Sequence, residues 1–120
     1  MPVRGIRGAT SVETNSRDEI FSKTEELLET LVNKNSLNIE DVASVIFSVT
    51  DDIDDAFPAA AARKMGWDFV PLFGCGEIPV KGSPRGIIRA LMHVNTEKSQ
   101  REMAHSYLHR AAELRPDIGN

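Results

Sequence analysis

The stretch FVPLFGCGEIPVKGSPRGIIRALM, residues 69–92, decides how the rest of the chain is organised. It predicts two strands, at about 68–73 and 86–94, joined by a turn-rich loop. Arg89 lies inside the second apolar run, where burying a guanidinium costs free energy unless an anion meets it. Glu77 follows the first strand, so the two strand ends could hold a small polar molecule between them. A purely structural Arg–Glu ion pair explains the same residues, and both interpretations stay open.

Upstream, residues 3–12 predict a strand that contains two glycines, and glycine within a strand often marks a close approach of backbone or ligand. Because side chains alternate along a strand, Arg7 and Arg4 lie on opposite faces. Residues 16–19 have the Ser-x-x-Glu spacing of a capping box. Apolar residues then recur at helical spacing, which predicts one long helix at about 17–33.

The middle of the chain predicts a strand, an acidic loop and a short helix. Residues 43–49 are rich in β-branched and aromatic side chains, as strands are. The aspartates within 51–55 lack the glycine and the closing glutamate of a calcium loop, so we expect a solvated loop. Pro58 suits the first position of a short helix that stops at Gly66.

The segment 99–114 is ambiguous. Ser99 and Glu102 have the spacing of a capping box, and the alanines favour a helix. Tyr107 and Leu108 could equally begin a strand. The pattern alone leans towards helix and leaves the strand as an alternative.

Composition restricts the class of protein. A length of 120 residues predicts a single domain, with 118–120 as a flexible tail, and a chain so small rarely encloses a deep pocket without a neighbour. No apolar stretch reaches the length of a membrane span and the N-terminus has no secretory signal, so we expect a cytoplasmic protein with no membrane partner. The net charge of −4 argues against nucleic-acid binding. The chain has nine arginines and five lysines, and arginine favours the binding of small anions such as carboxylates and phosphates.

Few side chains in the sequence are reactive. His105 and His109 are four residues apart, like helical metal ligands, but no third ligand is evident, so we expect no metal site. Cys75 is the only cysteine, which excludes an internal disulfide, and no base is evident beside it. What remains is a set of arginines with one glutamate and one tyrosine. Such a set can hold and polarise an anion, or only bind it.

Several segments taken together resemble one family. In chain order they are Arg-Gly-Ile-Arg-Gly-Ala-Thr at 4–10, Phe57-Pro58-Ala59 with Arg63, Val70-Pro71 leading to Glu77, Ile88-Arg89, and Tyr107-Leu108 followed by Leu114-Arg115-Pro116-Asp117. They closely resemble the monofunctional, homotrimeric chorismate mutases of bacterial type. The resemblance extends over about residues 3–117.

The resemblance implies an α+β fold, with a mixed five-stranded sheet, one long helix and short helical turns. It implies that three subunits form a pseudo-α/β-barrel with an active site at each interface, and that a strand begins near Tyr107. The activity implied is the rearrangement of chorismate to prephenate in phenylalanine and tyrosine biosynthesis, a branch of the shikimate pathway. No cofactor is implied. A non-catalytic or imine-hydrolysing trimer that binds small anions is the alternative.

Site residues follow from the same resemblance. Arg89 is matched to the arginine that donates to the breaking ether oxygen, and Glu77 to the carboxylate that accepts from the ring hydroxyl. The substrate-binding matches are Arg7, Tyr107, Phe57, Ala59, Arg63, Leu72, Phe73, Gly74, Leu114 and Arg115, of which Phe57, Ala59 and Arg63 are implied to come from the adjacent subunit. The family often has cysteine where this chain has Gly74, so Cys75 is not counted as catalytic.

Overall fold

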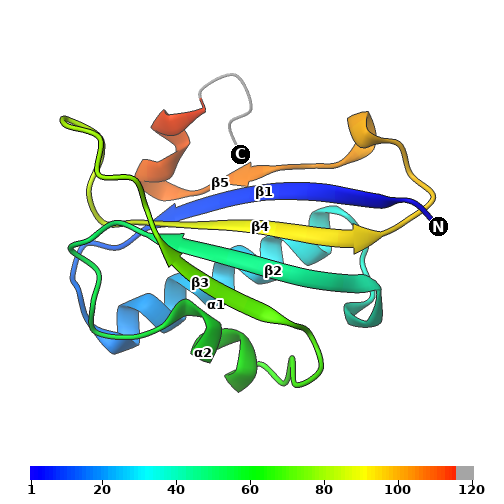
Figure 1. Ribbon diagram of the computed structural model, residues 1–120, viewed down its shortest axis with the longest axis horizontal. Helices are drawn as coiled ribbons and strands as arrows, with labels where there is room; N and C mark the ends of the chain where they lie inside the picture. Colours follow the sequence, from blue (N-terminus) through cyan, green and yellow to red (C-terminus); the bar gives the residue numbers. More distant parts are fainter. Residues whose placement is uncertain (116–120) are drawn as a thin grey trace.

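The computed structural model describes residues 1–115, and the tail predicted at 118–120 lies outside that range. Five strands form one mixed sheet, and both α-helices cover the same face of it (Figure 1). In chain order the elements are β1 (Val3–Ser11), α1 (Arg17–Lys34), η1 (Ile39–Asp41), β2 (Val42–Val49), α2 (Pro58–Lys64), β3 (Leu72–Gly76), β4 (Ile87–Asn95), η2 (Gln100–Glu102), β5 (Ser106–Tyr107) and η3 (His109–Leu114), where η marks a 3-10 helix. The predicted mixed sheet, long helix and short helical turns are confirmed.

The strand β4 lies at the centre of the sheet, whose order is β3-β2-β4-β1-β5. It runs antiparallel to β1 and β2, whereas the edge strands β3 and β5 run parallel to β2 and β1. The pairing of β1 with β4 is continuous, from Val3 opposite Asn95 to Ser11 opposite Ile87. Residues opposite each other share a face, so this register aligns side chains from distant parts of the sequence in rows across the sheet.

The helix α1 begins at the predicted cap. The Ser16 hydroxyl accepts a hydrogen bond from the Glu19 main-chain N–H (3.2 Å). The carboxylate of Glu19 does not complete the capping box, because it accepts from the N–H groups of Glu13 and Thr14 instead. The cap therefore also fixes the connection from β1 into the helix.

The core lies between α1 and the sheet. Leu27, Leu28 and Leu31 of the helix are fully buried with Ile6 of β1. At Gly8 a Cβ atom would come within 2.9 Å of a Leu27 methyl group and 3.0 Å of a Leu31 methyl group. The glycine predicted to mark a close approach therefore allows α1 to lie directly on β1.

The strand β3 differs from the prediction at 68–73, because it begins at Leu72 and continues to Gly76. Its extent is set by parallel pairing with β2, from Val45 opposite Leu72 to Val49 opposite Gly76. Apolar composition predicted a strand a few residues too early and ended it at the first glycine. An edge strand needs partners for its backbone, and glycine supplies those as well as any other residue.

The ambiguous C-terminal segment contains both of the structures that its pattern suggested. Ser99 and Glu102 form a complete capping box, but the helix that follows is the short η2. Ser106 and Tyr107 form β5, a two-residue strand beside Gly8 and Ala9, and η3 follows it. The helix favoured by pattern over 99–114 is wrong, because only the 3-10 helices η2 and η3 form there, and the strand implied near Tyr107 is confirmed.

The acidic loop after β2 exposes Asp51, Asp54 and Asp55 to solvent, as we expected, but its carboxylates also bond other segments. Asp52 accepts a hydrogen bond from the N–H of Gly86, and Asp55 accepts one from the N–H of Arg17 (2.8 Å). Asp54 bonds the side chain of Asn15 (2.7 Å). The carboxylates tie this loop to the start of α1 and the start of β4. Although burial opposes ionisation of Asp52, hydrogen bonds from the Thr50 side chain and from the main chain lower its pKa.

Within residues 1–115, none of the helices has the combination of length and apolar character that a membrane span requires.

Candidate active site

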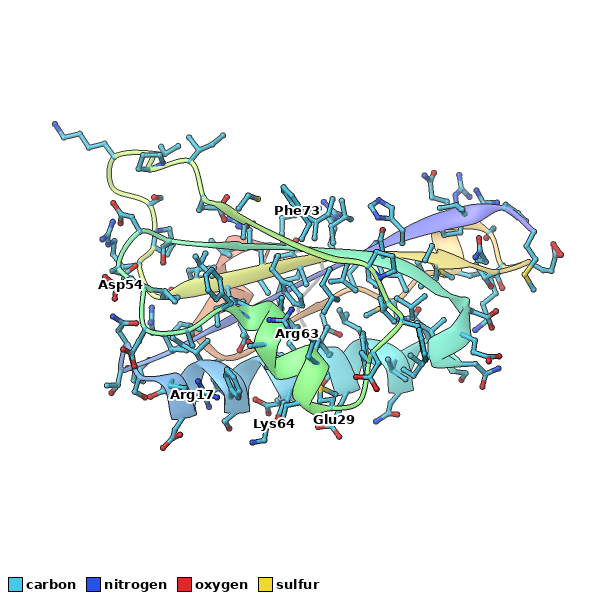
Figure 2. All side chains as sticks on the ribbon, turned by 60° about the horizontal axis from the view of Figure 1, so that its bottom comes forward. Arg17, Glu29, Asp54, Arg63, Lys64 and Phe73 are labelled. Carbon is cyan, nitrogen blue, oxygen red and sulfur yellow. The ribbon has the colours of Figure 1, made fainter. Side chains whose placement is uncertain are left out.

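The sheet face opposite the two helices, here called the open face, carries one row of side chains that crosses all five strands. Cys75 of β3 lies opposite Ser48, Ser48 opposite Arg89, Arg89 opposite Ala9, and Ala9 opposite Tyr107. Figure 2 shows the open face uppermost, with Phe73 above the sheet and the helices below it. The register therefore places the arginine and the tyrosine on either side of one small residue.

Arg89 forms an ion pair with Glu77 through its Nε atom and the carboxylate oxygen Oε2. The Glu77 main-chain N–H donates to the carbonyl of Val49 (2.8 Å), which fixes the residue at the end of β3. The side chains of Arg89 and Glu77 are 40% and 25% exposed, so water reaches both only in part. The predicted anionic partner of the strand arginine is confirmed. Within residues 1–115, no hydrogen bond is made by the Nη groups of Arg89 or to Oε1 of Glu77, which leaves these atoms for a ligand.

Arg7 lies on the open face in the next row, opposite Leu91. Its side chain is exposed, and its main-chain N–H donates to Nδ1 of His105 (2.9 Å). Burial lowers the pKa of His105, and the positive charges of Arg7 and Arg115 lower it further. Sequence reasoning had considered His105 only as a metal ligand and missed this position beside Arg7. No local signal could have revealed it, because the parallel pairing of β1 with β5 creates the contact.

Tyr107 is only 3% exposed and belongs to a small apolar cluster with Ala9, Ile87 and Ala111. Leu114 of η3 packs against this cluster. The predicted C-terminal cover therefore lies on the tyrosine side of the open-face row.

A second group of predicted residues lies elsewhere. Phe57, Ala59 and Arg63 line a cleft of about 890 Å³ between α2 and β3, on the helix side of the sheet. Figure 2 shows Arg63 on α2, below the sheet and on the opposite side from Phe73. Within one chain, these residues are not brought to the pair formed by Arg89 and Glu77.

The four residues of β3 from Leu72 to Cys75 divide between the two faces. Leu72 packs against the main core, whereas Phe73 is 66% exposed on the open face. Gly74 borders the α2 cleft, and the Cys75 thiol donates to the Phe47 carbonyl (3.4 Å). Of the three residues predicted here, the structure directs the side chain of Phe73 alone towards the open face.

The two histidines considered as metal ligands have separate partners. His105 accepts from Arg7, and His109 bonds Glu26 of α1 (2.8 Å). In the part of the chain that the structure describes, no three His, Cys, Asp or Glu side chains are grouped so that they could share a metal ion.

These features define an α+β protein that presents a partly dry, paired guanidinium on an open sheet face. The structure is similar to a chorismate mutase from Clostridium thermocellum, with a TM-score of 0.88 and 48% identity over 89% of this chain and 96% of that one. The chain is 41% identical to the chorismate mutase AroH of Bacillus subtilis, over 98% of this chain and 94% of that one. It is 45% identical to the chorismate mutase AroH of Thermus thermophilus, over 97% of this chain and 96% of that one.

The family model for chorismate mutase type I matches residues 3–118. The chain belongs to the chorismate mutase type I family, and it is accordingly an isomerase. The family resemblance predicted from the sequence is confirmed, and the alternative of a non-catalytic or imine-hydrolysing trimer is not favoured.

Proposed function

We propose that this chain converts chorismate to prephenate at a site that two subunits of a homotrimer share, with Arg89 and Glu77 as the catalytic residues. Membership of the chorismate mutase type I family supplies the reaction. The observation that supports the site is the ion pair of Arg89 and Glu77 on the open face. Among residues 1–115, the Nη groups of Arg89 and Oε1 of Glu77 make no hydrogen bond.

The reaction requires a site that binds and orients the substrate, and it requires no nucleophile. Within one molecule a carbon–oxygen bond breaks and a carbon–carbon bond forms, so no proton transfer and no covalent enzyme intermediate are required. Negative charge grows on the ether oxygen as its bond breaks, and a guanidinium fixed at that oxygen stabilises the transition state more than the ground state. In this proposal the Nη groups of Arg89 supply that donor, and Glu77 accepts from the ring hydroxyl.

The remaining open-face residues hold the substrate in its compact reactive shape. Arg7, one row from Arg89, and Tyr107 bind the carboxylates. Leu114 and Arg115 cover the site from the C-terminal side, and Phe73 lines it on the side of β3.

The homotrimer brings in the second group of residues. Phe57, Ala59 and Arg63 come from the neighbouring subunit in this proposal, because within one chain they lie across the sheet from Arg89. The exposed apolar side chains of Ile46 and Phe73 on the open face also favour an assembly that covers them. We expect no cofactor, and a cytoplasmic role in phenylalanine and tyrosine biosynthesis.

The test is to add the purified protein to chorismate and to follow the loss of chorismate absorbance in the ultraviolet, with prephenate identified as the product. Light scattering on the same sample is expected to give three times the 13.2 kDa chain mass. No loss of absorbance at micromolar protein would contradict the activity, and a monomer that is fully active would contradict the shared site.

A further inference from the structure

Ser48 is a second open-face residue of the sheet, besides Arg89, that contacts the carboxylate of Glu77. It lies in β2 directly opposite Arg89 on one side and Cys75 on the other. Its hydroxyl donates to Oε2 of Glu77 at 3.3 Å, the same oxygen that Arg89 bonds through Nε. We infer that Ser48 is a positioning residue that fixes the Glu77 carboxylate so that Oε1 faces the substrate, an inference that rests on the proposed role of Glu77.

The geometry explains why a second donor is useful. Glu77 lies just beyond the end of β3, and its side chain has three rotatable bonds that must be held in one arrangement. In the free protein the charge of Arg89 holds Oε2. When a ligand binds the Arg89 guanidinium, the attraction of Arg89 for Glu77 is shared with the ligand. The Ser48 hydroxyl does not bind the ligand in this scheme, so its hydrogen bond to Glu77 is kept.

The same contact also fixes the direction of the second oxygen. The two oxygens of a carboxylate are equivalent, so what matters for the substrate is where the oxygen that bonds neither Arg89 nor Ser48 points. With Arg89 and Ser48 both on Oε2, turning the carboxylate would break two hydrogen bonds at once. The separation of 3.3 Å is long for a hydroxyl donor, and hydrogen bonds of a free active site often tighten when substrate binds.

The chain offers a matched control in Ser44. It lies four residues earlier on β2, on the same face, is half-buried like Ser48, and bonds Nδ1 of His93 on β4 (3.1 Å). Ser44→Ala also removes a serine hydroxyl from β2, but this hydroxyl bonds His93 and not Glu77. Ser48→Thr keeps the hydroxyl and adds a methyl group that strands accommodate well.

In the full-length enzyme, we expect Ser48→Ala to lower kcat/KM for chorismate by about tenfold, the size of a hydrogen bond to a charged group. Ser48→Thr should recover most of that loss, and Ser44→Ala should stay within about twofold of the parent. Thermal unfolding midpoints of the two alanine variants should agree. A Ser48→Ala enzyme within twofold of the parent would overturn the inference, and so would a Ser48→Thr enzyme as impaired as Ser48→Ala.

A double-mutant cycle with Glu77→Ala separates positioning from a general structural effect. If Ser48 acts through Glu77, then Ser48→Ala should change kcat/KM by less than about twofold once Glu77 is removed. An equal tenfold loss in both backgrounds would overturn the inference while leaving the proposed function intact. A Glu77→Ala enzyme as active as the parent would overturn the proposed role of Glu77 and this inference with it.

Discussion

The main-chain N–H of Arg7 donates a hydrogen bond to Nδ1 of His105, 2.9 Å away. This acceptor exists only while the imidazole is neutral. Its pKa is lowered by burial and by the charges of Arg7 and Arg115, so the neutral form is the one present at neutral pH. The first strand and the C-terminal segment are thus joined beside a predicted substrate arginine by a contact that acid can break.

We expect the rate to change little between about pH 7 and 9, because the proposed mechanism transfers no proton. In acid, both stability and substrate binding should weaken. The folded-state pKa of His105 lies below its ordinary value of 6.5, so the unfolded chain binds more protons as pH falls through that value. The contribution of this contact is present above about pH 6.5 and lost below it.

Urea unfolding and KM measured from pH 5 to 8 check this. His105→Gln should reduce the acid dependence of both the unfolding free energy and KM. The control is His109→Gln, since His109 bonds Glu26 and not Arg7, and this variant should show the acid dependence of the parent. A bell-shaped rate profile centred near neutrality would contradict the proposed mechanism.

Replacing Arg89 by citrulline should lower kcat by at least about 10³, because citrulline keeps the shape of the side chain but loses the charge. KM should change much less, since Arg7 and Tyr107 would still hold the carboxylates. Arg89→Lys should fail as well, because a flexible point charge cannot reproduce the guanidinium fork. A citrulline enzyme with kcat within tenfold of the parent and a raised KM would show that Arg89 only binds substrate.

Mixing an Arg63→Ala chain with an Arg89→Ala chain should restore part of the activity that each variant alone has lost. The two residues lie across the sheet from each other, so a shared site in a mixed trimer can combine an intact Arg63 with an intact Arg89. The measurement is kcat after subunit exchange, with mixed trimers verified by mass. No recovery in verified mixed trimers would count against a site at the interface.

Gly8→Ala should destabilise the protein by about 1–3 kcal/mol, because the new Cβ would lie 2.9 Å from Leu27 and 3.0 Å from Leu31 and would push α1 away from β1. Gly76→Ala is the control, since no atom lies within 4 Å of its Cβ position, and its effect should stay within about 0.5 kcal/mol. Urea unfolding of both variants gives the two values, and equal stabilities would show that the helix absorbs the extra methyl group.

Arg110→Ala should raise KM for chorismate more than it lowers kcat. The Arg110 guanidinium bonds the carbonyls of Val12 (3.0 Å) and Arg85 (3.3 Å) and the carboxylate of Glu13 (2.8 Å). It therefore anchors η3, which carries Leu114 over Tyr107. Steady-state kinetics check this, with the exposed Arg101→Ala as the control. An unchanged KM would show that η3 keeps its place without the anchor.

The sequence by itself determined the elements whose signals are local. Ser16 caps α1 and Pro58 starts α2 because each acts on backbone groups within one helical turn. The partner of Arg89 was predicted for a similar reason, since a guanidinium in an apolar strand requires an anion nearby. The order of family segments along the chain added the reaction class.

Tertiary structure alone decided the features that depend on pairing between distant segments. Four such features follow from strand register. They are the extent of β3, the length and partners of β5, the row from Arg89 through Ala9 to Tyr107, and the contact of His105 with Arg7. Register is fixed by packing the whole sheet against α1, and residues nearly a hundred positions apart have no local pattern in common. The sequence therefore contained Arg89 and Tyr107, and the pairing of the strands placed them in one row of the sheet.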